Sequence, residues 1–220
     1  MVGLPFLMET FDNSLLVLGE KGSGKTVLLA ELGAYWDGPV KLVDPLGVFR
    51  RNENDRPSIL IPQSIVYEDF RGWMNEQDPE FNKAVFSFKP TPDELLMICE
   101  SCEPETLLMI DEISLFADRA FQTYPPILDF ARRCRNAGVT LVLAAQRPQS
   151  IDPQLSELAV SSVCSRQTGI NARERAAKIV GVKPDDIKDL RAGEWLYLYP
   201  GADPDEKVIF IPPRYPYLYK

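Results

Sequence analysis

Short apolar runs alternate with longer amphipathic segments along most of the chain. The runs are strand-length and lack a clean alternation of apolar and polar positions, which is typical of strands buried on both faces of a sheet. Strands are predicted at 14–19, 39–44, 84–90, 106–112, 139–146 and 161–167. Helices are predicted at 24–36, 92–102, 125–138, about 152–159 and 171–182. This order predicts an α/β fold with a mostly parallel central sheet flanked by helices.

Two regions depart from this alternation. The segments 193–201 and 207–213 alternate apolar and polar positions like a small antiparallel hairpin, which we expect to extend one edge of the sheet. Residues 47–83 are polar and contain proline, and we interpret them as a helical excursion or an irregular insertion. At 220 residues the chain fits one domain. We expect this domain to span 1–220, with an N-terminal arm at about 1–13, a core at 14–182 and a C-terminal extension at 183–220.

The segment GEKGSGKT (19–26) lies between the first predicted strand and the first predicted helix, and it matches the pattern G-x-x-x-x-G-K-[ST]. Its glycines let the backbone wrap a phosphate chain closely, and backbone N–H groups at the helix N-terminus form an anion site. We expect Lys25 to reach the β- and γ-phosphates and the Thr26 hydroxyl to ligate Mg²⁺. The predicted nucleotide-binding residues are Gly19, Glu20, Lys21, Gly22, Ser23, Gly24, Lys25, Thr26 and Val27.

An acidic pair closes the strand TLLMIDE (106–112), at the sheet edge where open α/β sheets bind their ligands. Asp111 fits a carboxylate that holds Mg²⁺, directly or through water, and Glu112 fits a general base for the attacking water. Two surface acids at a strand end are the alternative. Because a kinase has little use for a base aimed at water, the pair favours hydrolysis. The intervening length predicts that another strand lies between this strand and that of the phosphate loop.

Gln146 ends the strand that follows the acidic pair. A polar residue there would lie beside the γ-phosphate, where its amide can hydrogen-bond both phosphate and water. An ordinary strand-end glutamine is the alternative. We expect Gln146 to sense whether the γ-phosphate is present.

The segment RNAGVTLVLAAQRPQSIDPQLSEL resembles the HerA/FtsK superfamily of ring-forming, DNA-translocating P-loop ATPases, in which an Arg, a Gly, an apolar strand and Gln-Arg-Pro follow the acidic pair. GEKGSGKT, VDPLG and LLMIDE precede it in the order of that superfamily, so the resemblance covers roughly 14–180. It implies a RecA-like fold of the additional-strand type, with ATP and Mg²⁺ as cofactors.

The resemblance also implies an arginine finger that reaches into the nucleotide site of a neighbouring subunit. Arg135 matches the Arg-x-x-Gly stretch of the superfamily and is the first candidate, ahead of Arg166 and then Arg147. An arginine finger accelerates hydrolysis by roughly 10³–10⁵. Activity would therefore depend on assembly into a homo-oligomeric ring, a hexamer by analogy.

The net charge of −8 argues against a simple coat on duplex DNA, which is normally basic. A DNA contact would need a local basic patch or a pore within a ring. Arginines gather at 132–135 and at 147, although a solvated helix face explains such a cluster equally well. The segments 50–56 and 117–124 are our candidates for the lining of a pore.

Four cysteines and no histidine limit the metal chemistry open to the chain. Cys99 and Cys102 form a C-x-x-C motif on a predicted helix, and we expect ordinary reduced thiols, with a four-cysteine zinc site as the alternative. No apolar run reaches the roughly 18 residues of a membrane helix, and the first residues lack a signal-peptide pattern. We therefore expect no stable membrane insertion, and a location in a host cytoplasm or in a virion.

The phosphate loop begins at residue 19, and we identify neither the barrel domain nor the membrane helices of cellular superfamily members. What remains resembles the small genome-packaging ATPases of membrane-containing viruses with double-jelly-roll capsids. That resemblance implies a motor for double-stranded DNA, with a capsid or membrane vertex as a further partner. The alternatives are a conjugation, secretion or filamentous-phage assembly motor, and a monomeric P-loop kinase or nucleotide switch.

Overall fold

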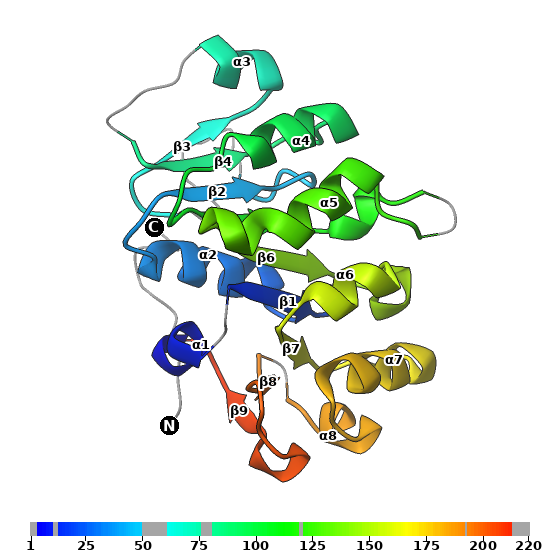
Figure 1. The fold of residues 1–220 in the computed structure, drawn as a ribbon. Helices are drawn as coiled ribbons and strands as arrows, with labels where there is room; N and C mark the ends of the chain where they lie inside the picture. Colours follow the sequence, from blue (N-terminus) through cyan, green and yellow to red (C-terminus); the bar gives the residue numbers. More distant parts are fainter. Residues whose placement is uncertain are drawn as a thin grey trace.

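The computed structural model describes residues 4–10, 13–49, 61–75, 81–118, 121–191 and 193–212. Its centre is a nine-stranded sheet in the order β3-β4-β2-β5-β6-β1-β7-β8-β9 (Figure 1). The strands are β1 (Ser14–Leu18), β2 (Val40–Val43), β3 (Ser64–Tyr67), β4 (Lys83–Phe86), β5 (Leu107–Ile110), β6 (Thr140–Ala145), β7 (Ser161–Ser165), β8 (Trp195–Leu198) and β9 (Val208–Phe210). The strands from β3 to β7 in this order are parallel, and β8 and β9 are antiparallel. The predicted fold class and the antiparallel C-terminal extension are confirmed.

Helices cover both faces of the sheet. They are α1 (Leu4–Thr10), α2 (Lys25–Tyr35), α3 (Phe70–Asn75), α4 (Pro92–Glu100), α5 (Pro125–Arg133), α6 (Pro153–Leu158), α7 (Ile170–Val180) and α8 (Pro184–Lys188). Short 3₁₀ turns are η1 (Ile113–Phe116), η2 (Cys134–Ala137), η3 (Pro148–Ser150) and η4 (Pro204–Glu206). None of the helices in the described part of the chain is both long and apolar enough to cross a membrane.

Side chains of the buried strands point alternately into two apolar cores, one on each face. Along β6, Leu141 and Leu143 belong to the core covered by α3 to α8, whereas Val142 belongs to the core covered by α1 and α2. Because both faces are covered, the strand sequences need no polar positions, which explains their continuous apolar runs.

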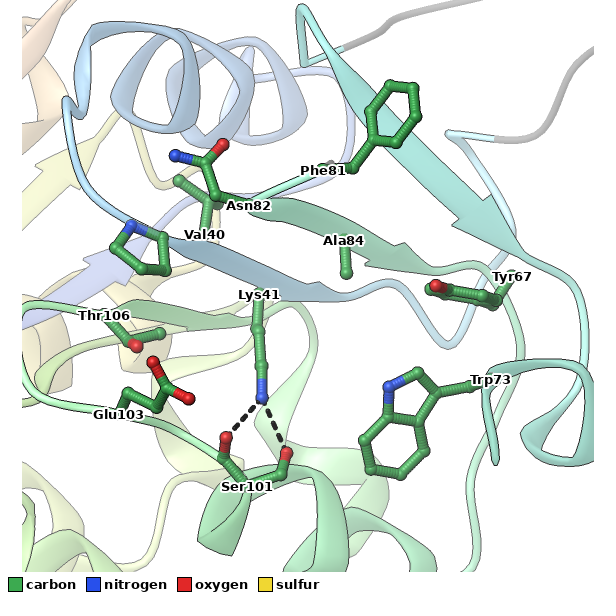
Figure 2. A pocket seen from close by; sticks show the side chains of 11 residues that line it. Val40, Lys41, Tyr67, Trp73, Phe81, Asn82, Ala84, Ser101, Glu103 and Thr106 are labelled. Atoms are coloured by element: carbon green, nitrogen blue, oxygen red, sulfur yellow. Dashed lines mark hydrogen bonds between the residues drawn. The ribbon is translucent and has the colours of Figure 1, made fainter. Parts of the chain in front are cut away.

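Two lysines, Lys83, which is buried, and Lys41, which is half-buried, fasten helices to this sheet by binding the carbonyl groups of helix C-termini. On β4, Lys83 donates from Nζ to the carbonyl oxygens of Gly33 and Trp36 in α2 and just after it, at 3.0 and 2.9 Å. On β2, Lys41 donates to the carbonyl oxygen and the hydroxyl of Ser101 after α4, both at 2.6 Å (Figure 2). A cation at a helix C-terminus satisfies carbonyls that lack partners within the helix.

The interpretation of residues 47–83 was wrong in one part. Ser64–Tyr67 forms β3, which pairs in parallel with β4 at the edge of the sheet, and α3 follows it. Three of the four β3 residues are only half-buried, so their sequence lacks the continuous apolar character of the central strands. That character was the signal on which the strand predictions depended.

The predicted helix at 125–138 changes type before it ends. α5 stops at Arg133, and the chain continues through η2 to Gly138, whose φ of 72° is readily adopted only by glycine.

The sequence predicted that one strand lies, within the sheet, between the strand of the acidic pair and the strand of the phosphate loop. This prediction is confirmed, because β6 lies between β5 and β1. The carboxyl ends of β5, β6, β1 and β7 therefore meet at one edge of the sheet.

Candidate nucleotide site

The phosphate loop connects β1 to α2 at the carboxyl edge of the sheet. Gly22 and Gly24 have φ values of 81° and 91°, in the left-handed region that favours glycine. Gly24 occupies the N-cap position of α2 and supplies no side-chain hydrogen bond to the first N–H groups of the helix. Those N–H groups are thus available to an anion.

Gly19 lies where the loop leaves β1, in a space too small for a side chain. A Cβ atom at this position would come within 2.4 Å of the Ser23 hydroxyl and 2.9 Å of the Ser165 hydroxyl. Its backbone N–H donates to the carbonyl oxygen of Ala145 on β6, at 3.1 Å. The loop is therefore anchored directly to the end of the strand that precedes Gln146.

The side chains of the phosphate loop differ in exposure. Lys25 begins α2 and is buried, and Thr26 and Val27 follow it in the first helical turn and are half-buried. Glu20 points toward the loop that follows β7: its carboxylate accepts hydrogen bonds from the backbone N–H and the hydroxyl of Thr168, at 3.1 and 2.8 Å. Glu20 thereby ties the phosphate loop to the loop between β7 and α7.

Asp111 is buried directly after β5, and one of its carboxylate oxygens accepts the N–H of Glu112 at 3.0 Å. Burial raises the pKa of this carboxyl to about 6. The positive charge of Lys25 opposes this rise, and the negative charges of Glu112 and Asp44 add to it. A buried carboxylate that faces a lysine and further acids is characteristic of a site that receives a cation.

Glu112 has a backbone conformation that is uncommon for a side chain of its size, with φ 53° and ψ 54°. This turn directs a buried carboxylate toward Gln146: its Oε1 accepts the Ser114 hydroxyl at 2.8 Å and the Gln146 backbone N–H at 3.3 Å. The other oxygen, Oε2, is buried and has no hydrogen-bond partner among the described residues. One oxygen thus fixes the carboxylate and the other remains able to accept a proton from water.

Asp44 is a site residue that the sequence reasoning missed. It follows β2 and is fully buried, and its Oδ2 accepts the Phe49 N–H at 2.8 Å and the Ser87 hydroxyl at 3.3 Å. Its Oδ1 is buried without a partner in the described part of the chain, and its charge raises the pKa of Asp111. The signal was an acid at the last position of the predicted strand 39–44, before a Pro-x-Gly turn. This segment served only to support the family resemblance.

The predicted metal ligands fit Mg²⁺. Thr26 and Asp111 provide oxygen donors, which Mg²⁺ prefers, and phosphates and water complete its shell in nucleotide enzymes. No group of three or more His, Cys, Asp or Glu side chains within the described ranges is arranged to hold a metal ion. The four cysteines are free, and three of them are buried. The zinc alternative therefore gains no support from the described residues.

The three candidate arginine fingers lie in different places. Arg166 follows β7 and, together with phosphate-loop residues, lines a cavity of about 220 Å³ at the carboxyl edge. Arg147 is exposed at the same edge, next to Gln146. Arg135 is exposed on η2, ahead of the first residue of β6, and so lies toward the amino edge of the sheet. Only Arg135 is remote from the phosphate loop of its own subunit.

Two other arginines of the predicted basic cluster have acidic partners on the surface. Arg132 contacts Asp129 at 2.8 Å, and Arg133 contacts Glu100; all four side chains are about half exposed or more. The solvated-face interpretation is sufficient for these two residues.

Of the segments considered for a pore lining, 50–56 lies outside the described residues, as do 119 and 120. The described residues 117, 118 and 121–123 form the two sides of a short hairpin, whose base is a bridge between Ala117 and Thr123. A cavity of about 530 Å³ lies away from the described residues of these segments, beside β2 and β4 and next to Lys41 and Trp73 (Figure 2). None of the predicted site residues lines it.

Replacement of Asp111 should stabilise the protein in the absence of nucleotide and Mg²⁺. Because the pKa in the folded state, about 6, exceeds the unfolded value near 3.9, the folded state binds more protons between these pH values. The free energy of unfolding therefore falls as the pH rises from about 4 to about 6. At pH 7 Asp111→Asn should raise it by on the order of 2 kcal/mol, and the gain should shrink toward pH 4.

Urea unfolding of both proteins at pH 4 and pH 7 measures this difference. Asp205→Asn, at an exposed position, is the matched control and should change stability little at either pH. An Asp111→Asn variant that is no more stable than the wild type at pH 7 would show that burial of this charge does not destabilise the site.

The sequence matches no family model and no curated protein. Solved structures do match. The genome packaging NTPase B204 from Sulfolobus turreted icosahedral virus 2, in complex with ATP-gammaS, aligns with a TM-score of 0.69 at 17% identity, over 92% of this chain and 98% of that chain. The DNA-packaging ATPase B204 from Sulfolobus Turreted Icosahedral Virus aligns with a TM-score of 0.65 at 14% identity, over 93% and 99%.

VirB4 of Thermoanaerobacter pseudethanolicus aligns with a TM-score of 0.62 at 11% identity, over 94% of this chain and 91% of that chain. At these identities the likeness concerns the fold. The chain therefore has the fold of these P-loop ATPases.

Proposed function

We propose that the chain is an ATP-hydrolysing translocase that packages double-stranded DNA into a viral particle as a homo-oligomeric ring, a hexamer by analogy. The observation that carries the proposal is the arrangement at the carboxyl edge. There the phosphate loop, Asp111, Glu112 and Gln146 meet, and Glu112 is fixed through one oxygen and free at the other. A carboxylate held in this way suits hydrolysis better than transfer to a second substrate.

Each residue has one task in the proposed reaction. Lys25 and the N–H groups of the phosphate loop bind the β- and γ-phosphates of ATP. Thr26 and Asp111 would hold Mg²⁺, which would supply positive charge to the phosphate oxygens. Glu112 accepts the proton of the attacking water through Oε2, and Gln146 donates from its side-chain amide to the γ-phosphate.

Arg135 is the proposed arginine finger. A residue at the amino edge of the sheet does not reach the phosphate loop of its own subunit, so it can act only on the site of a neighbour. Arg166 lines the cavity beside its own phosphate loop and is better placed to contact the bound nucleotide in the same subunit. This placement favours Arg135 over Arg166 as the residue that acts between subunits.

The fold comparisons support the packaging role, and they are also consistent with a conjugation or secretion motor. B204 is described as a genome packaging NTPase, and its length is covered almost completely. VirB4 and the pCW3 conjugation coupling protein TcpA have similar folds, although only 60% of TcpA is covered. A conjugation or secretion motor is therefore the second candidate. For the packaging motor we propose a capsid or membrane vertex as the docking partner, and a host cytoplasm or virion as the location.

ATP turnover with and without DNA tests the proposed function. Random-sequence duplex should raise turnover, and the stimulation should fall with added salt because a pore contacts the phosphate backbone rather than the bases. Glu112→Gln is the control, since it should bind ATP-gammaS like the wild type yet show no turnover with or without DNA. Stimulation by single strands alone would favour a conjugation motor, and no response to any DNA would contradict translocation.

Mixed rings test the assignment of Arg135. Lys25→Ala subunits lack a working phosphate loop but carry an intact Arg135, whereas Arg135→Ala subunits have the reverse defect. Each variant alone should be inactive, and a mixture should recover part of the wild-type turnover if the arginine acts on a neighbour. A mixture that stays inactive, although its subunits co-assemble, would leave Arg135 with a structural role only.

A further inference from the structure

Two loops leave the nucleotide edge from neighbouring strands. The first follows Glu112 after β5 and contains η1 and the hairpin 117–123. The second follows Gln146 after β6 and contains η3, and it ends at Asp152, the N-cap residue of α6. At their origins the loops are joined by the hydrogen bond from the Gln146 N–H to the Glu112 carboxylate.

The same loops are joined again at their far ends by Asp152. Its Oδ2 accepts the backbone N–H of Thr123 at 2.8 Å, and its Oδ1 accepts the N–H of Gln154 at 2.9 Å. Asp152 is 4% exposed, and so is Thr123. The carboxylate therefore uses one oxygen to cap α6 and the other to hold the base of the hairpin.

The hairpin held in this way is internally closed. Its base is the bridge between Ala117 and Thr123, and the Asp118 N–H donates to the carbonyl oxygen of Gln122 at 2.9 Å. The Gln122 N–H donates in turn to the Asp118 carboxylate at 3.0 Å. Phe121, beyond these bonds, is 49% exposed. Thr123 is therefore linked to Ala117, Asp118 and Gln122 on the two described sides of the hairpin.

A helix cap alone does not require an aspartate here. Serine and threonine cap helices about as well, but their side chains are shorter and have a single oxygen. The second oxygen of Asp152 instead spans 29 residues of sequence to reach Thr123. The loops are therefore tied at both ends, by the Gln146–Glu112 bond near the nucleotide edge and by the Asp152–Thr123 bond at the hairpin.

We propose that Asp152 is a positioning residue that couples the γ-phosphate end of the nucleotide site to the hairpin 117–123. One part of the inference rests on the proposed function: the identity of what the hairpin contacts, which would be the DNA or the neighbouring subunit. The connection itself, from Gln146 through Asp152 to Thr123, depends on contacts within one chain.

Asp152→Ser separates the two roles of the side chain, because serine keeps the cap of α6 but is too short to reach Thr123. Asp203→Ser is the matched control, since Asp203 also caps a short helical turn, η4, far from the nucleotide edge. The first readout is amide hydrogen exchange of 117–123 with and without ATP-gammaS. In the wild type and in Asp203→Ser, the nucleotide should slow exchange in the hairpin; in Asp152→Ser, this effect should be lost and the Thr123 amide should exchange about tenfold faster.

The second readout is the ratio of duplex-stimulated to basal ATP turnover. Asp152→Ser should keep basal turnover within about twofold of the wild type and lose most of the stimulation, whereas Asp203→Ser should keep both. If Asp152→Ser is unstable, Asp152→Asn replaces it, because asparagine has the same shape and caps helices but offers one acceptor oxygen for two donors.

The outcomes separate the inference from the proposed function. An Asp152→Ser protein that retains the nucleotide effect on hairpin exchange would reduce Asp152 to a helix cap and overturn the inference. If the wild type ignores duplex DNA but its hairpin still responds to ATP-gammaS through Asp152, translocation fails and the coupling stands. If Asp152→Ser and Asp152→Asn both lose basal turnover as well as stimulation by duplex DNA, the substitution damages the nucleotide site itself. That result would also contradict the inference.

Discussion

The hydrogen bond from the Gln146 backbone to the Glu112 carboxylate is the contact on which the rest of the site depends. It connects the ends of β5 and β6, and it holds one oxygen of the proposed base while the other stays unpaired. The left-handed backbone of Glu112 brings its side chain to this position, and such conformations persist only where surrounding contacts enforce them. In the proposed reaction, water activation by Glu112 and the response of Gln146 to the γ-phosphate therefore share one point of the fold.

Around this contact the protein buries more negative charge than it neutralises. Asp44 and Glu112 each keep one buried oxygen without a partner among the described residues, and both raise the pKa of Asp111. Desolvated carboxylates that lie close together are unfavourable for the empty protein. They are suited to a site that receives a cation together with nucleotide, so the apo protein gives up stability for function.

Some of this could be predicted from the sequence because the signal is local. The phosphate loop is a continuous motif, and the acids and Gln146 come directly after buried strands, so their meeting follows from the parallel order of the sheet. Asp44 has the same kind of signal but was not recognised as a site residue. The strand β3 escaped prediction because an edge strand lacks a continuous apolar run.

Other features depend on contacts that no local pattern encodes. The arginines singled out in the sequence look alike. In the structure Arg132 and Arg133 pair with surface acids, Arg135 lies toward the amino edge of the sheet and Arg166 lies at the carboxyl edge. The bond between Asp152 and Thr123 joins residues from two loops, and in the sequence Asp152 reads simply as a residue that begins a helix. Contacts between residues that are distant in the sequence therefore decide whether a residue is placed to act within its own subunit or on a neighbour.

The central claim is that the nucleotide site is complete only within a ring. Turnover per subunit, measured across protein concentrations together with the mass of the assembly in the presence of ATP, tests this claim most directly. We predict that turnover per subunit rises with concentration in step with the appearance of a closed oligomer. A strict monomer that hydrolyses ATP at the same rate at every concentration would contradict the account.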